Sequence, residues 1–277
     1  MEQADRIIMV YIKIDEAYKA ITQGKALRQR GFAPGLSDAE VLTMEIIGEM
    51  EGKNGDRAIW RYFNRHWRSW FPRMPHYKTF AKQCANLCRI KEAIMQHIFP
   101  MKAKVHIIDG IPLPVCHNAR ASRSRMLDTC TSWGFCAAKD EHYYGLRGHL
   151  VMNAEGFISQ GTVTPANENE RSVLGNLIGH VKGMLIGDKG FIDQSWKTLL
   201  AQHGIDLQTP LRSNMMDQRS PAFVKALMKV RKSIETAFSV LVSQFSFTKI
   251  KAHDLWHFLN KFSRKILAFN FYVFFKS

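Results

Sequence analysis

Apolar residues recur at helical spacing through the first hundred residues of the chain. The pattern begins with Ile7–Ile14 and returns at residues 55–71 and 77–98. Between these segments, Ser37 and Glu40 have the spacing of a capping box and precede an apolar run. The first third of the chain is therefore predicted to be helical.

After Pro100 the pattern changes to short apolar runs that alternate with amphipathic segments. Strands are predicted at residues 104–110, 143–153, 157–165, 183–191 and 205–210, and helices at 169–181, 194–204 and from about 221. Three antiparallel strands followed by alternating helices and strands predict a mixed α/β sheet with flanking helices. The apolar stretch 266–275 is too short to span a bilayer and predicts a buried terminal helix. We therefore expect a helical domain over residues 1–103 and a sheet domain with a C-terminal helix over 104–277.

Two of the predicted strands are followed directly by an aspartate. Asp109 comes after the run that begins at Val105, and Asp188 comes after the run that begins at Gly183. A strand interior does not tolerate a lone carboxylate, whereas the end of a strand can present one into a crevice. If the two strands are neighbours, both carboxylates lie at one edge of the sheet.

A third acid is expected from a following helix. Glu235 is the best candidate because Ile234, Phe238 and Leu241 flank it at helical spacing. The rival acids are Glu168, Glu170, Asp193 and Asp206. Carboxylates that meet at one point repel each other unless a cation lies between them, and Mg²⁺ prefers such hard oxygen ligands. A pair of these ions supports in-line attack on a phosphodiester.

Composition adds a polyanionic partner to this picture. The chain has 39 Lys and Arg against 24 Asp and Glu, a formal charge of +15, and the basic residues are spread over a folded body. Nucleic acid is the partner that such a surface suits best, although ribosomal and membrane-surface proteins are also basic. The candidate DNA contacts are Arg57, Arg61, Arg65, Arg120, Arg123, Arg125, Lys189, Lys229, Arg231 and Lys232. For each of them, a solvated surface position remains the alternative.

The five cysteines do not predict a zinc site or a disulfide framework. Cys84 and Cys88 lie one helical turn apart, but no matching Cys or His pair stands nearby in the sequence. The number is odd and the N-terminus lacks the apolar core of a signal peptide. Reduced thiols in a cytoplasmic protein are therefore expected.

Several segments together resemble a known family. The stretches IIDGIPLPVC, YYGLRGHLVMN, GDKGF and RKSIETAFS are similar to the DDE transposases of bacterial insertion sequences, and most similar to the insertion sequence 982 group. The acids Asp109, Asp188 and Glu235 are separated by 79 (188 − 109) and 47 (235 − 188) residues. Each short motif is weak by itself, whereas their joint order and spacing are specific.

The resemblance implies a ribonuclease H-like catalytic fold and a magnesium-dependent reaction, with Mn²⁺ as a substitute. It implies cleavage at the element ends and joining of the freed 3′ hydroxyl to target DNA, with Asp109, Asp188 and Glu235 as catalytic metal ligands. The partners would be double-stranded DNA, as terminal inverted repeats and target, and a second copy in a homodimer on DNA. No membrane is involved, and a cytoplasmic, nucleoid-associated bacterial protein is expected.

The chain departs from the family around its third acid. Related transposases carry a Tyr seven residues before this acid, an Arg four before it and a Lys seven after it. Arg231 fills the Arg position, whereas Met228 and Val242 stand at the other two. The contacts of the missing Tyr and Lys are therefore not carried over.

Two other functions compete with a transposase. One is a metal-dependent nuclease of the same fold, and the other is a DNA-binding descendant without catalysis. The intact acid triad argues against the second of these. The helical first hundred residues favour a transposase over a nuclease, because recognition of element ends needs a separate DNA-binding part.

Overall fold

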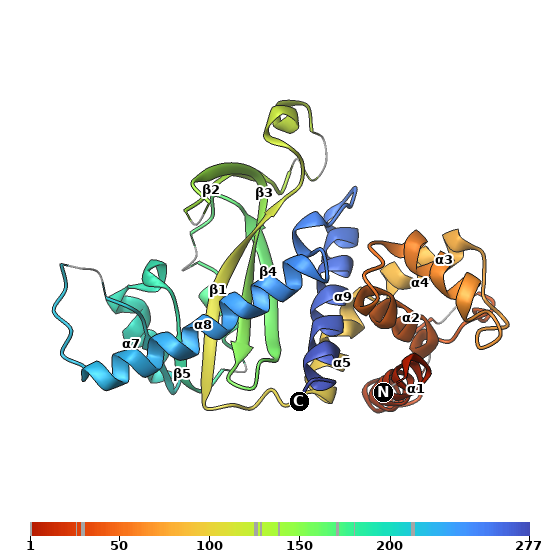
Figure 1. Cartoon of the computed structure of the whole chain (residues 1–277), viewed down its shortest axis with the longest axis horizontal. Helices are drawn as coiled ribbons and strands as arrows, with labels where there is room; N and C mark the ends of the chain where they lie inside the picture. Colours follow the sequence, from red (N-terminus) through yellow and green to blue (C-terminus); the bar gives the residue numbers. More distant parts are fainter. Residues whose placement is uncertain are drawn as a thin grey trace. The chain divides into compact units, whose positions relative to one another are not determined.

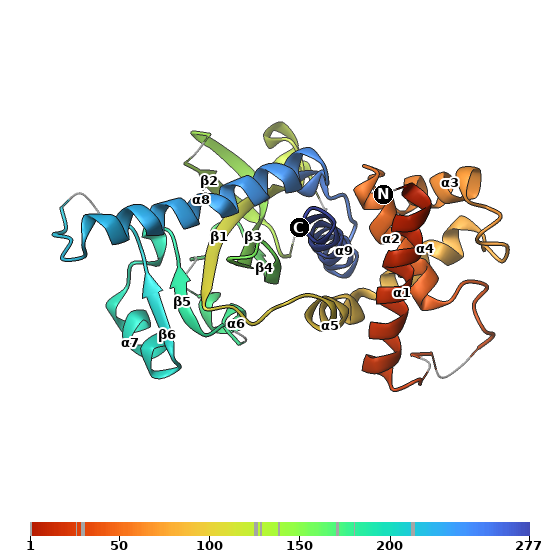
Figure 2. The same cartoon turned by 60° about the horizontal axis from the view of Figure 1, so that its bottom comes forward.

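The computed structural model describes residues 2–25, 27–28, 31–124, 127, 129–137, 139–169, 172–179, 181–211 and 214–277. The chain divides into two compact units (Figures 1 and 2). One unit contains Met1–Phe99 and Ser243–Ser277, and is called the helical unit below. The other contains Pro100–Val242 and is called the sheet unit.

Helices make up the ordered elements of the helical unit. They are α1 (Gln3–Thr22), α2 (Asp38–Met50), α3 (Asp56–His66), α4 (Tyr77–Asn86), α5 (Cys88–Ile98), the short η3 (Phe247–Lys249) and α9 (Leu255–Phe274). The predicted capping box at the start of α2 is present: Ser37 Oγ accepts from the Glu40 amide at 3.1 Å, and Glu40 Oε2 accepts from the Ser37 amide at 2.6 Å. The helical pattern read from the first hundred residues is therefore confirmed.

The prediction of a single helix over residues 77–98 is wrong, because the helix is interrupted at Leu87 and forms α4 and α5 instead. Two side chains bond the carbonyls near this break. The indole of Trp256 donates to the Ala85 carbonyl at 3.0 Å, and Lys91 Nζ donates to the Cys84 carbonyl at 3.2 Å. The bond from Trp256 comes from a residue 171 positions away, so local periodicity does not indicate the break.

The C-terminal helix α9 belongs to the helical unit, whereas the sequence pattern assigned it to the catalytic part. Its Arg264 pairs with Glu45 at 3.2 Å, with Glu49 at 2.7 Å and with Asp56. The neighbouring Lys265 pairs with Glu49 at 2.7 Å. These side chains are almost fully buried, apart from a partly exposed Asp56, and their contacts join α9 to α2 and the start of α3. Among the described residues, no helix is long and apolar enough to cross a membrane.

Replacement of Arg264 by methionine is expected to destabilise the chain by about 3–5 kcal/mol, because it leaves carboxylates buried without their partner. Burial opposes ionisation of Asp56, but Arg264 outweighs this effect and holds the pKa of Asp56 below its usual value. Urea denaturation measures the loss. The exposed Arg65→Met on α3 is the control, with an expected change within about 0.5 kcal/mol. A loss below about 1 kcal/mol for Arg264→Met would contradict the assigned role.

The described part of the sheet unit holds a six-stranded mixed sheet. Its strands are β1 (Val105–Pro114), β2 (Ser132–Cys136), β3 (Glu141–Asn153), β4 (Ile158–Pro165), β5 (Gly183–Ile186) and β6 (Ile205–Gln208). The order is β2-β3-β1-β5-β6, and β4 also pairs with β3. The first four strands pair antiparallel, and β5 and β6 continue the sheet from β1 in parallel. The predicted mixed α/β sheet is confirmed, with β2 as an element that the sequence pattern missed.

Short helices connect the strands, and one long helix follows them. They are η1 (Asn118–Arg123), α6 (Leu174–Leu177), η2 (Lys189–Phe191), α7 (Gln194–Gln202) and α8 (Pro221–Ser243). Within the described residues of the helix predicted over 169–181, only the single turn of α6 is helical. The core around β5 packs Leu185 against Phe191 and Leu200, so that α7 covers the parallel part of the sheet.

Candidate active site

Asp109 lies within β1 at the place where the pairing of that strand changes. Strand β5 pairs with β1 only from Val105 to Ile107, whereas β3 continues alongside β1 as far as Pro114. Beyond Ile107, β1 is therefore an edge strand on its β5 side, and an edge tolerates Pro112 and Pro114 without loss of sheet hydrogen bonds. The expectation that Asp109 follows the end of its strand is wrong, because β1 continues past it to Pro114. The side chain of Asp109 is 19% exposed at this edge.

Asp188 follows β5 in a tight turn that packing holds in place. A side chain at Gly187 would lie about 3.0 Å from the ring of Phe191, which is fully buried. The Gly187 amide donates to the Gln208 carbonyl of β6 at 3.0 Å. Asp188 Oδ1 accepts from the Lys189 amide at 2.6 Å and caps η2. The backbone therefore fixes Asp188 beyond the end of β5, as the sequence pattern predicted.

Glu235 reaches the same region from α8. The buried residues of this helix are Leu227, Ile234, Ala237 and Leu241, and Glu235 stands beside them with a side chain that is 54% exposed. Two residues before α8, Arg219 donates to Gln208 Oε1 at 2.8 Å and to the Thr209 carbonyl at 3.1 Å. Arg219 thus ties the loop that leads into α8 to the end of β6.

The three acids converge on the guanidinium of Arg231. Its Nη2 atom lies 3.5 Å from Asp188 Oδ1 and 3.9 Å from Asp109 Oδ2, and its Nη1 atom lies 3.4 Å from Glu235 Oε1. The side chain of Arg231 is only 17% exposed. Residues 79 and 47 positions apart along the chain therefore meet around one cation, at the edge where α8 passes β1 (Figure 1).

These distances describe a loose cluster. Charge-assisted hydrogen bonds to a carboxylate usually measure about 2.7–2.9 Å, so the Arg231 contacts are long. The three carboxylates also lack the compact spacing of a metal-ligand group, since their oxygens are not all within 4.8 Å of one another. One guanidinium against three carboxylates leaves an excess of negative charge at the site. Arg231 therefore balances only part of the charge of the three acids.

A group with compact spacing does exist in the described part of the helical unit: Glu45, Asp56 and Cys84. Its carboxylates are already neutralised, because Arg264 contacts both of them and Lys91 Nζ lies 2.9 Å from Glu45 Oε2. Burial raises the pKa of the Cys84 thiol well above its usual value and keeps the thiol protonated. This group is a structural ion-pair network. Its cations already balance the negative charge of the carboxylates that a metal ion would otherwise balance.

The acids of the sheet unit fit a divalent cation by their chemistry. Carboxylate oxygens are the hard ligands that Mg²⁺ and Mn²⁺ prefer. The nearby His149, on β3 opposite Gly110, adds no positive charge at neutral pH, since burial and Arg147 lower its pKa to about 4. Its ring bonds Thr164 Oγ1 at 2.9 Å.

The predicted DNA contacts lie at separate places. Arg57, Arg61 and Arg65 are exposed on α3, as are Arg120 and Arg123 on η1. Exposed residues near the acids are Lys189, Lys229 and Lys232, whereas Arg125 lies outside the described residues. Arg231, which the sequence pattern placed among the DNA contacts, lies instead between the three acids. Its position four residues before Glu235 in a helix was the sequence signal for this pairing.

Comparisons with known proteins agree with this architecture. A search of curated proteins finds no match. A family model described as a transposase DDE domain matches residues 100–252, more than half of the chain. Among solved structures, a piggyBac transposase in a synaptic complex with hairpin DNA is similar at a TM-score of 0.52 and 10% identity. The likeness covers 97% of this chain and 72% of that one, and it supports a ribonuclease H-like fold. The chain belongs to the transposase DDE domain family.

Proposed function

We propose that this chain is a DNA transposase that cleaves DNA at the ends of an insertion sequence and joins the freed 3′ hydroxyl to target DNA. Membership of the transposase DDE domain family supports the transposase. The observation that carries the chemistry is the convergence of Asp109, Asp188 and Glu235 on one guanidinium. The resemblance of the motifs supports the further proposal that the element belongs to the bacterial insertion sequence 982 group.

The divalent cations would be held by Asp109, Asp188 and Glu235. These cations would be Mg²⁺, for which Mn²⁺ can substitute. When bound between such acids, divalent ions activate the attacking hydroxyl and stabilise the leaving oxygen of a phosphodiester. Asp109 is held by the paired backbone of β1, and Asp188 by the packed turn after β5. Glu235 stands on α8 with a more exposed side chain, so it is the acid with the most freedom to adjust to a ligand.

Arg231 is proposed as the internal counterion of this acid cluster. Three like charges at one edge repel each other, and a guanidinium 3.4–3.9 Å from all three offsets this repulsion. A divalent cation and the guanidinium compete for the same oxygens. Arg231 would therefore withdraw if the acids bound a metal, and its freed guanidinium could pair with a DNA phosphate.

DNA is proposed to contact both units. In the helical unit, Arg57, Arg61 and Arg65 form an exposed basic row on α3 that suits the phosphates of an element end. In the sheet unit, Lys189, Lys229 and Lys232 stand near the acids, and Arg120, Arg123 and Arg125 follow β1 in the sequence. A homodimer is proposed because two element ends have to be joined together in one reaction.

A strand-transfer assay tests the proposed function. The purified chain is incubated with MgCl₂, a target plasmid and labelled DNA that ends in the inverted repeats flanking its gene. We expect labelled 3′ ends joined to the plasmid, and no product in EDTA. Nicking without joining would favour a metal-dependent nuclease, and binding without either would favour a non-catalytic descendant. Both of these outcomes contradict the proposal.

A further inference from the structure

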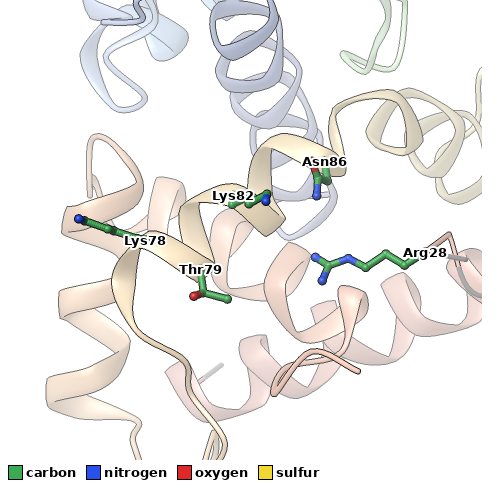
Figure 3. A pocket seen from close by; sticks show the side chains of 5 residues that line it. All are labelled: Arg28, Lys78, Thr79, Lys82 and Asn86. Atoms are coloured by element: carbon green, nitrogen blue, oxygen red, sulfur yellow. The ribbon is translucent and has the colours of Figure 1, made fainter. Parts of the chain in front are cut away.

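A groove of about 600 Å³ lies in the helical unit, far along the chain from the acids of the sheet unit (Figure 3). Its lining consists of Arg28, Lys78, Thr79, Lys82 and Asn86. Three of these side chains are cations, two are neutral hydrogen-bonding groups, and none is acidic. A lining with three cationic side chains and no carboxylate indicates an anion as the ligand.

Four of the lining residues share one face of α4. Lys78, Lys82 and Asn86 follow each other at intervals of four residues, and Thr79 lies beside them. Arg28 comes from the segment between α1 and α2 and extends toward the side of α4 that carries Lys82 and Asn86 (Figure 3). The cations therefore line the groove from two separate elements.

A neighbouring face of α4 is bonded to the start of α2. Gln83 is fully buried and donates to the Leu36 carbonyl at 3.0 Å and to Asp38 Oδ1 at 2.7 Å. The hydroxyl of Tyr18 at the end of α1 donates to the other oxygen of Asp38 at 2.7 Å. These bonds connect α1, α2 and α4, the helices next to the groove.

The electrostatics of the groove favour a bound anion. Among the described residues, no carboxylate forms an ion pair with Arg28, Lys78 or Lys82. The first turns of α1, α2 and α3 each contain an acid that compensates the positive end of the helix, whereas the first turn of α4 contains Lys78. A cation at this end is locally unfavourable, and a bound anion would offset its cost.

A contact between two helices links this groove to the arginine row on α3. The guanidinium of Arg57 lies 5.8 Å from the ring centre of Tyr77, the residue that precedes Lys78. Lys78 and Lys82 are about 6 Å apart along the axis of α4, a span that covers neighbouring phosphates of a duplex strand, which recur about every 3.4 Å of its axis. Arg57, the first member of the arginine row, therefore contacts α4 at the residue next to Lys78 in the sequence.

We infer that Arg28, Lys78 and Lys82 form a binding groove for the phosphodiester backbone of duplex DNA, with Thr79 and Asn86 as neutral donors. This inference rests on the proposed function, because it assumes that the chain binds DNA. It adds a second contact to the row on α3, at residues that sequence periodicity did not single out. Backbone contacts of this kind position a duplex without reading its sequence.

The test compares two double variants of the full chain, Lys78→Gln with Lys82→Gln and, as control, Lys19→Gln with Lys276→Gln. Both remove two exposed lysines from the helical unit, so their net charges are equal. Binding to a labelled duplex is measured by fluorescence anisotropy over a series of KCl concentrations, and circular dichroism verifies the fold. The groove variant should bind at least about tenfold more weakly at 150 mM KCl, with a salt slope lower by about 1.8, since each phosphate contact contributes about 0.9.

The control should stay within about twofold of the wild type. Equal affinities and slopes for the two double variants overturn the groove, even where the wild type joins DNA in the strand-transfer assay and the proposed function holds. A wild-type chain that neither binds nor joins DNA overturns both. The groove variant could also bind polyglutamate more weakly than the wild type while its DNA binding is unchanged. That result would indicate an acidic protein as the ligand of the groove and would also overturn the inference.

Discussion

Asp109→Asn is expected to reduce DNA strand cleavage by at least about 10³-fold, equivalent to about 4 kcal/mol of transition-state stabilisation, and to leave DNA binding within about twofold. Asparagine keeps the shape of the side chain but removes the charge that would hold a divalent ion. The fold should tolerate the change, because it removes one of three mutually repelling carboxylates around Arg231. Initial rates of nicking on a labelled substrate in MgCl₂ measure the effect.

Glu155→Gln is the matched control, because this exposed acid belongs to the same unit and lies in the turn between β3 and β4. It should cleave at the wild-type rate. Glu235→Gln and Asp188→Asn should resemble Asp109→Asn, and double variants should lose little more activity, since residues that act as one unit are not additive. Cleavage by Asp109→Asn at a rate close to that of the wild type would refute the assigned site.

Arg231→Gln is expected to bind Mn²⁺ about tenfold more tightly than the wild type, a gain of about 1.4 kcal/mol. The guanidinium now lies within 3.4–3.9 Å of all three acids, and removing it takes away a cation that competes with the metal for their charge. In EDTA the variant should melt at a lower temperature, because the repulsion between the acids is no longer offset. Saturating Mn²⁺ should close this gap, as a ligand of the folded state stabilises it by mass action.

Isothermal titration calorimetry with Mn²⁺ and thermal melts measure these two effects without any reaction. Lys232→Gln removes a neighbouring, exposed charge from α8 and should change the affinity by less than about threefold. Arg231→Lys keeps a cation near the acids and should fall between the two. If Arg231→Gln bound Mn²⁺ no more tightly than Lys232→Gln, the counterion role would be wrong.

Local sequence patterns singled out the three acids that lie around Arg231, whereas their catalytic role stays a prediction. Asp109 and Asp188 come after β-branched or apolar runs, and the parallel pairing of β1 with β5 brings these runs side by side. The central position of Arg231 was not predictable. Its spacing shows only that it neighbours Glu235, whereas its approach to Asp109 and Asp188 depends on the path of α8 past the sheet.

Other differences arise from contacts between distant residues. At the break at Leu87, Trp256 donates a hydrogen bond to a nearby carbonyl. Helix α9 is joined to the helical unit because Arg264 pairs with Glu45 and Glu49, more than 200 positions away in the sequence. Strand β2 was missed because Trp133 and Phe135 remain 49% and 43% exposed, and such a strand lacks the usual alternation. The groove lined by Arg28 was missed because spacing within α4 does not reveal which segment lies beside it.

The central claim is that Asp109, Asp188 and Glu235 hold one divalent site. Anomalous diffraction from a crystal of the chain soaked in MnCl₂ tests it most directly. We expect an anomalous peak in contact with oxygens of all three carboxylates, with the guanidinium of Arg231 moved away from them. A soaked crystal without a peak among these acids, in which Arg231 keeps its three contacts while Mn²⁺ is bound elsewhere on the chain, would contradict the account.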